Sequence, residues 1–221
     1  MDNKKIKAAR LLELEGVEIT SNIYNMILGG TLLWGVLVNL LMAVFLQEPI
    51  LRLPYWATLV IYLVGSLGCS FVIYKSNQPV VSFLGFTGLS ISMGILITYY
   101  VTFFEASDVR KAYFVTAGVT LLMMLVSSIY PAFFRSLGKT LFIALVGVLI
   151  GELVLMLFGM YPNIFDWIYC LIFCGYVGYD WAVAQSYPPT VDHAIDSAAD
   201  IYVDVVNLFI RILSLMGRRN D

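Results

Sequence analysis

Residues 23–46 read IYNMILGGTLLWGVLVNLLMAVFL, a run of 24 residues without a charged side chain. A helix needs about 20 mostly apolar residues to cross the hydrocarbon core of a bilayer. The 22 residues before this run are charged and lack the apolar core and the small-residue cleavage site of a signal peptide. We therefore expect residues 23–46 to stay in the mature chain as a membrane anchor.

The rest of the chain repeats this pattern. Of the 221 residues, 60% are hydrophobic and 13% are charged, about half the charged share of a typical soluble domain. Short breaks that carry proline, charge or both separate six further apolar stretches, which are 54–74, 79–103, 109–130, 138–159, 163–186 and 198–216. Because short connections make consecutive helices antiparallel neighbours, we predict an all-α, polytopic membrane bundle of seven transmembrane helices over 23–216, with the last helix central.

The distribution of lysine and arginine predicts the orientation. If the N-terminus is inside, seven of these residues fall in inside segments (Lys4, Lys5, Lys7, Arg10, Lys75, Arg135, Lys139) and five in outside segments (Arg52, Arg110, Lys111, Arg218, Arg219). We predict a cytoplasmic N-terminal segment over 1–22, a C-terminal tail over 217–221 and a place in the cell (plasma) membrane. The net charge of −2 excludes nucleic acid as an expected partner, since no basic stripe could neutralise phosphates.

Three acids inside predicted spans stand out, because an ionised side chain there is costly and marks a functional site. They are Glu152 in the fifth span, Asp180 in the sixth and Asp204 in the seventh. Asp180 lies roughly 10–12 Å inside the cytoplasmic end of its span, and Asp204 lies roughly 9 Å past the start of its own. Because the two spans run antiparallel across a short loop, we expect both carboxyls at one level.

A polar stripe on the last span continues from Asp204. Asp196, Asp200 and Asp204 are spaced by four residues, and Asn207 and Arg211 follow on the same face. In lipid such a face must point into the bundle or a water-filled pathway, so its residues Asp196, Asp200 and Asn207 are candidates for an ion pathway. Glu152 of the fifth span is a further candidate. Arg211 could pair with Glu152 or stay in the outer half of the membrane, and one protonated hydrogen bond to a neighbouring helix could instead satisfy Glu152.

Two close carboxyls in a low-dielectric site cannot easily both ionise, so they titrate as one coupled unit. Such a pair serves as a proton sensor, a ligand for a divalent cation, or a general acid and base. The alternative is a hydrogen-bonded pair that only fixes helix packing.

Other polar or reactive residues favour structural interpretations. His193, the lone histidine, is expected in a solvated loop. Residues 65–68 read GSLG, without the spacing of a serine-nucleophile elbow, and small residues of this kind allow close helix packing. Cys69, Cys170 and Cys174 lie in apolar runs without zinc-site spacing, so we expect them to pack between helices.

Residues 201–209 read IYVDVVNLF, which resembles the Leu-Tyr-x-Asp-x-x-Asn-Leu-Phe segment of the transmembrane Bax inhibitor motif family. Tyr179-Asp180 is similar to the Tyr-Asp of the sixth span in that family, whose members have six or seven spans. The resemblance covers roughly 23–216 and implies a member of the bacterial type that acts as a pH-sensitive calcium leak. It implies that Asp180 and Asp204 form the pH-sensing pair and bind calcium transiently.

The resemblance also implies a latch on the first aspartate, which bacterial members form with an arginine near the cytoplasmic end of the second span. Here that region reads Ile73-Tyr74-Lys75-Ser76, so Lys75 could substitute only as a point charge without the arginine fork. Arg211 is a second candidate for the latch.

These observations predict a passive calcium leak gated by protonation of Asp180 and Asp204, with the lipid bilayer, calcium and protons as partners, calcium as the permeant ion and no cofactor. A proton-coupled exchanger is a variant of this function. The first alternative is a regulator that binds other membrane proteins and transports nothing. The second is an intramembrane aspartyl protease, although the Gly-x-Gly-Asp and Pro-Ala-Leu motifs of those enzymes are absent, and we expect no enzymatic activity.

Overall fold

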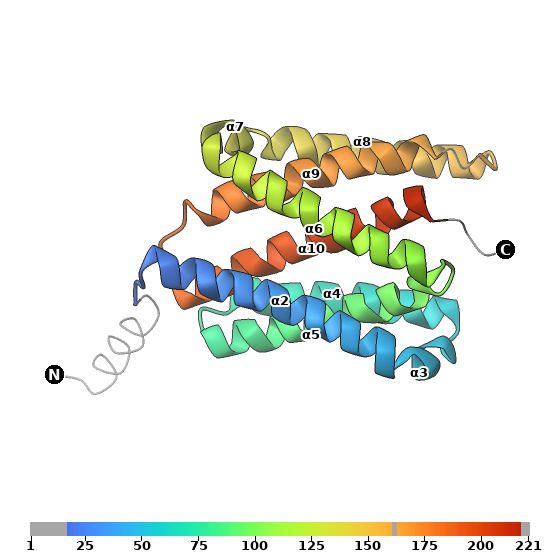
Figure 1. Ribbon diagram of the computed structural model, residues 1–221, viewed down its shortest axis with the longest axis horizontal. Coiled ribbons are helices and arrows are strands. Elements are labelled where there is room, and N and C mark those ends of the chain that lie inside the picture. The colour runs from blue at the N-terminus through green and yellow to red at the C-terminus, as the bar shows by residue number, and fades with distance from the viewer. Residues whose placement is uncertain (1–16, 161–162, 218–221) are drawn as a thin grey trace. The chain divides into compact units, whose positions relative to one another are not determined.

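The structure is a computed structural model that describes residues 17–160 and 163–217. Six helices within these ranges are long and apolar enough to cross a membrane. They are α2 (Ser21–Phe45), α4 (Tyr55–Lys75), α5 (Pro79–Val101), α6 (Ala106–Ile129), α8 (Gly138–Leu157) and α9 (Ile164–Ala184) (Figure 1). They match the first six predicted spans, with ends that differ by three residues or fewer. The all-helical prediction is confirmed for the described residues, which contain no strand.

The last helix, α10, runs from Val191 to Met216 and has 26 residues. At 1.5 Å per residue it is about 39 Å long, which exceeds the thickness of the hydrocarbon core. It is not among the six apolar helices, because four aspartates and one arginine interrupt it. The seventh crossing therefore stays a prediction.

The predicted span starts at residue 198, where the apolar stretch begins, whereas α10 itself begins at Val191. Thr190 caps this start, since its hydroxyl accepts a hydrogen bond from the His193 N–H at 3.2 Å and its carbonyl accepts one from Ala194. His193 is consequently in the first turn of α10 and partly buried. Its Nδ1 atom is 2.9 Å from the Pro188 carbonyl oxygen, and its ring stacks on Tyr187. The prediction of a solvated loop histidine is wrong because a cap, rather than apolar character, sets the start of this helix.

Two short helices fall in predicted breaks between spans. They are α3 (Gln47–Leu51) and α7 (Pro131–Ser136). Pro131 is the first residue of α7, a position where the missing N–H of proline has no helical partner to lose. The predicted cytoplasmic segment 1–22 falls mostly outside the described residues, as does all of the predicted tail except Gly217.

The chain divides into two compact units, and α10 contributes to both. The first unit contains the residues up to Leu96 together with Tyr187–Ala199. Small residues bring its helices close together: a side chain at Gly65 of α4 would collide with Ser92 of α5, and one at Gly88 would meet the Cys69 sulfur at 2.7 Å. Close packing at small residues is typical of helices in lipid. It accounts for Gly65 in the 65–68 stretch and places Cys69 between helices.

The second unit contains residues 97–186 and 200–221. Its centre is α9, which packs against α6, α7 and α8. A side chain at Gly178 would strike the Phe134 ring of α7, and one at Gly175 would meet Leu141 of α8 at 2.7 Å. The Ser127 hydroxyl of α6 donates a hydrogen bond to the Gly178 carbonyl at 2.5 Å. The glycines thus place α9 where its polar residues can meet those of its neighbours.

Apolar side chains cover the outside of these helices. Within α8 only Leu141 is buried, and Phe114 and Leu157 are 80% and 86% exposed. Exposed apolar area on this scale marks contact with lipid rather than with water. Most apolar side chains of α10, by contrast, are buried, as expected of a central helix.

Candidate functional site

Asp180 and Asp204 meet within the second unit, and we call them the aspartate pair. Asp180 lies four residues before the end of α9, and Asp204 lies near the middle of α10. Their carboxyl groups lie close enough to interact electrostatically and to share a hydrogen bond. Asp204 is 6% exposed, and Asp180 is partly buried. Because a carboxylate cannot donate a hydrogen bond, the two groups can share one only when one of them carries a proton.

The surroundings of the aspartate pair are acidic. Asp200, one turn before Asp204, adds a further negative charge close to it. No lysine or arginine described in the second unit forms an ion pair with either member. Among the described residues, the buried Oδ2 atom of Asp204 also has no hydrogen-bond donor. A buried carboxylate without a counter-charge is strongly unfavourable, so a proton or a bound cation is needed to neutralise the pair.

The remaining polar residues of the stripe have different surroundings. Asp196 and Asp200 are partly buried on α10. The Asn207 side-chain amide donates to the Val203 carbonyl at 2.8 Å, within the same helix. The structure extends the stripe backwards to Asp192, which is 8% exposed and accepts a hydrogen bond from Ser82 of α5 at 2.7 Å in the first unit. Asp192 lies four residues before Asp196, and this spacing could have placed it in the stripe from the sequence alone.

A second charged cluster joins α8, α9 and α10 in the second unit, and we call it the Arg211 cluster. The Nη1 atom of Arg211 is 2.9 Å from Asp166 Oδ1 and 3.8 Å from Glu152 Oε1. The Ser214 hydroxyl donates to the other oxygen of Asp166 at 2.7 Å. Of the two placements that the sequence left open for Arg211, pairing is the one found, and its shorter contact is to Asp166.

Tyr169 completes the Arg211 cluster. Its hydroxyl donates to Glu152 Oε2 at 2.7 Å, while its ring lies under the Arg211 guanidinium with 3.8 Å between the ring centroid and Cζ. A cation over an aromatic face is attracted by the ring quadrupole. Glu152 is therefore held by two partners from different helices, rather than by one hydrogen bond alone.

Asp166, Tyr169 and Ser214 were not predicted from the sequence. Asp166 lies in the first turn of α9, where a carboxylate is favourable beside the positive end of the helix dipole. An acid at that position looks like an ordinary helix start, so only contact with Arg211 distinguishes it. Tyr169 and Ser214 carry no charge and give no signal of their own.

Lys75, the first candidate for a latch, is the last residue of α4 and is exposed. Among the described residues of the first unit it forms no ion pair. Its role as a latch stays a prediction. Arg211, the second candidate, is occupied by Asp166 and Glu152 within its own cluster.

Both sites fall within a match to a known protein family. The family described as "Inhibitor of apoptosis-promoting Bax1" matches residues 17–221. The chain belongs to the Bax inhibitor family. The resemblance read from residues 201–209 and from Tyr179-Asp180 is thereby confirmed.

Several family relatives are similar to this chain at moderate identity. Bax inhibitor 1 of Schizosaccharomyces pombe is 31% identical over 134 residues, which cover 58% of this chain and half of the relative. An uncharacterized protein of Helicobacter pylori is 25% identical over 96% of the chain and 91% of its own length. The Golgi anti-apoptotic protein of Vaccinia virus is 25% identical over 71% of the chain and 67% of its own length. Family membership, with six apolar helices, makes this chain a multi-pass membrane protein.

Proposed function

We propose that this family member is a pH-sensitive passive pathway for calcium, gated by protonation of the aspartate pair. The observation that supports the proposal is the close approach of the Asp180 and Asp204 carboxyls in a place where no described cation of their unit forms an ion pair with them. With one shared proton the two carboxyls attract. Without it they repel and attract a divalent cation, so the charge of the pair sets both its geometry and its affinity for ions.

The pair suits passage of calcium better than its storage. Calcium takes six to eight oxygen ligands in stable protein sites, and the two carboxyls offer at most four. No group of three or more acidic, histidine or cysteine side chains in the described residues converges into a metal site. Asp200, Asp196 and the Asn207 side chain on the same helix are further oxygen donors at which a mobile, partly hydrated ion could pause.

The deciding experiment measures calcium flux into liposomes that contain the purified protein, from pH 5 to pH 8. We expect flux to change with pH in the wild type, and to lose that dependence in Asp204→Asn and in Asp180→Asn, because an amide cannot gain or lose the proton. Glu48→Gln is the matched control, since this carboxyl is 86% exposed and its contact with Arg52, which is 81% exposed, is long at 4.0 Å. A wild-type pH profile in both aspartate variants refutes the gating role.

We further propose that α10 is the seventh crossing and that the N-terminus lies in the cytoplasm. We propose the plasma membrane as the location of the protein. Thiol reagents that cannot cross membranes test this orientation. Cysteines introduced at Asn77 and Ser186 should react only from the inside, and cysteines at Arg52 and Asn163 only from the outside. Labelling of all four sites from one side contradicts the topology.

A non-transporting regulator is the second candidate function, supported by the names of relatives such as Bax inhibitor 1 and the Golgi anti-apoptotic protein. Flux no greater than that of empty liposomes, at every pH, favours this candidate. A protease is the third candidate, because two neighbouring aspartates could also activate water. Incubation with transmembrane peptides and mass spectrometry tests it, and we expect no cleavage.

An imposed proton gradient that drives calcium uphill identifies an exchanger rather than a leak.

A further inference from the structure

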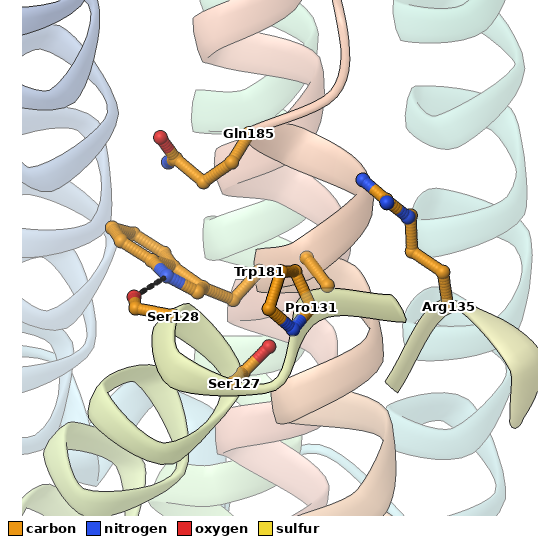
Figure 2. Close-up of a pocket in the computed structure, with 7 residues that line it drawn as sticks. Ser127, Ser128, Pro131, Arg135, Trp181 and Gln185 are labelled. Carbon is orange, nitrogen blue, oxygen red and sulfur yellow. Dashed lines mark hydrogen bonds between the residues drawn. The ribbon is translucent and has the colours of Figure 1, made fainter. Parts of the chain in front are cut away.

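A pocket of about 330 Å³ opens in the second unit where three helices meet. The end of α6, the short helix α7 and the last turn of α9 with the residue that follows it form its walls. The lining residues are Ser127, Ser128, Pro131, Arg135, Trp181, Ala182 and Gln185. Figure 2 shows the Arg135 guanidinium and the Gln185 amide toward one end of this pocket, and Ser127 and Ser128 toward the other. The pocket therefore has a cationic end beside an apolar wall.

Hydrogen bonds inside the protein occupy the donors at the serine end. The Trp181 indole N–H donates to the Ser128 hydroxyl at 2.8 Å, which itself donates to the Met124 carbonyl at 2.8 Å. The Ser127 hydroxyl donates to Gly178. Arg135 is the one charged lining residue, and it forms no ion pair among the described residues. No described carboxylate therefore competes for its guanidinium at the pocket.

The segment around the pocket is positively charged and lies at a membrane boundary. Between residues 112 and 151 the only charged residues are Arg135 and Lys139. The apolar helix α6 ends at Ile129 and the apolar helix α8 begins at Gly138, so α7 lies where these two candidate spans leave the hydrocarbon. Tyr130, which precedes Pro131 of the pocket, is 62% exposed, and tyrosine side chains settle at the level of the lipid headgroups.

We propose that this pocket binds the phosphate of an anionic phospholipid headgroup. The planar fork of an arginine matches two phosphate oxygens, and 330 Å³ lies within the range of small-molecule sites. Pro131, Ala182 and the Trp181 ring then face the glycerol and the upper part of an acyl chain. A soluble phosphate would share the contact with Arg135 but would leave this apolar wall unused.

Native mass spectrometry of the full chain, purified in a mild detergent, tests the proposal independently of any calcium flux. Dioctanoyl phosphatidylglycerol is the probe, dioctanoyl phosphatidylcholine is the zwitterionic comparison, and inorganic phosphate and glycerol 3-phosphate are soluble competitors. We expect phosphatidylglycerol to bind at least fivefold better than phosphatidylcholine and neither soluble phosphate to displace it. Displacement by equal concentrations of a soluble phosphate would overturn the lipid assignment.

Two matched variants locate the site. Arg135→Gln should lower phosphatidylglycerol binding about tenfold, whereas Lys139→Gln, which removes the other cation of the same segment outside the pocket lining, should change it less than twofold. Arg135 is exposed, so we expect the variant to fold, and an unchanged elution volume and thermal midpoint verify this. Equal losses in the two variants, or no loss in Arg135→Gln, contradict a built headgroup site.

Discussion

Replacing Arg211 with methionine removes the cation of the Arg211 cluster but keeps an unbranched apolar stem over the Tyr169 ring. The wild-type guanidinium contacts Asp166 at 2.9 Å and Glu152 at 3.8 Å. After the substitution two carboxylates face each other without a counter-charge. Their remaining hydrogen bonds come from neutral hydroxyls, those of Ser214 and Tyr169.

The magnitude follows from the burial of the three charged groups. Removing one partner of a fully buried ion pair costs about 3–5 kcal/mol, because the other charge is left uncompensated. The side chains of Arg211, Asp166 and Glu152 are 27%, 17% and 39% exposed, so water screens part of this penalty and we expect a loss of about 2–4 kcal/mol. For a chain of this size about 3 °C of thermal midpoint corresponds to 1 kcal/mol, which gives a fall of roughly 6–12 °C.

Thermal unfolding of the purified protein in detergent measures this change. Arg52→Met is the matched control, because Arg52 and its partner Glu48 are both more than 80% exposed and 4.0 Å apart. We expect that variant to change stability by less than about 1 kcal/mol. Adding Asp166→Asn to Arg211→Met should recover part of the lost stability, since one uncompensated charge disappears.

A midpoint in Arg211→Met within 2 °C of the Arg52→Met value would refute this reasoning, as would a double variant that is less stable than Arg211→Met alone. Either result would mean that the cluster is solvated in the folded protein. The contacts seen between α8, α9 and α10 would then contribute little.

Two further substitutions test buried contacts by the same unfolding measurement. Ser82→Ala removes the donor to the buried Asp192 carboxylate and should cost about 1–3 kcal/mol; Ser90→Ala, equally buried on α5 but bonded only to its own helix backbone, should cost less than half as much. Thr190→Val removes the cap of α10 and should cost about 1 kcal/mol, whereas Thr20→Val, at a helix start without a side-chain cap, should change little. Equal effects within either pair contradict the assigned contact.

The sequence predicted the six apolar helices well because lipid demands an unbroken apolar run, which composition reports directly. It predicted helix starts less well, since hydrogen bonds at the cap decide them. The fourth span was expected from residue 109, yet α6 begins at Ala106 and includes Asp108, which pairs with Lys111 at 2.8 Å. Charges near a helix start therefore mark the edge of the apolar run and not the end of the helix.

The aspartate pair could be found from the sequence because both are ionisable residues inside apolar stretches, where lipid makes them costly, although only Asp180 lies close to the loop that joins the two helices and Asp204 lies near the middle of α10. Contacts farther from that loop depend on helix tilt. Arg211 is seven residues beyond Asp204, or about 10 Å along α10, whereas Asp166 is fourteen residues before Asp180, or about 21 Å along α9. Straight antiparallel helices would separate these two side chains, so their contact needs both a crossing angle between the helices and the length of the arginine side chain. The spacing of residues along the sequence does not predict the crossing angle.

The two charged sites on α9 and α10 are neutralised in opposite ways, and this difference decides where a switch can lie. In the Arg211 cluster a proton added to Asp166 or Glu152 weakens the hold on a guanidinium that cannot itself lose charge, so protonation opposes a favourable pairing. In the aspartate pair a proton creates the hydrogen bond and its loss creates repulsion. Only the pair exchanges attraction for repulsion when one proton leaves, and we therefore assign the proposed gate to Asp180 and Asp204.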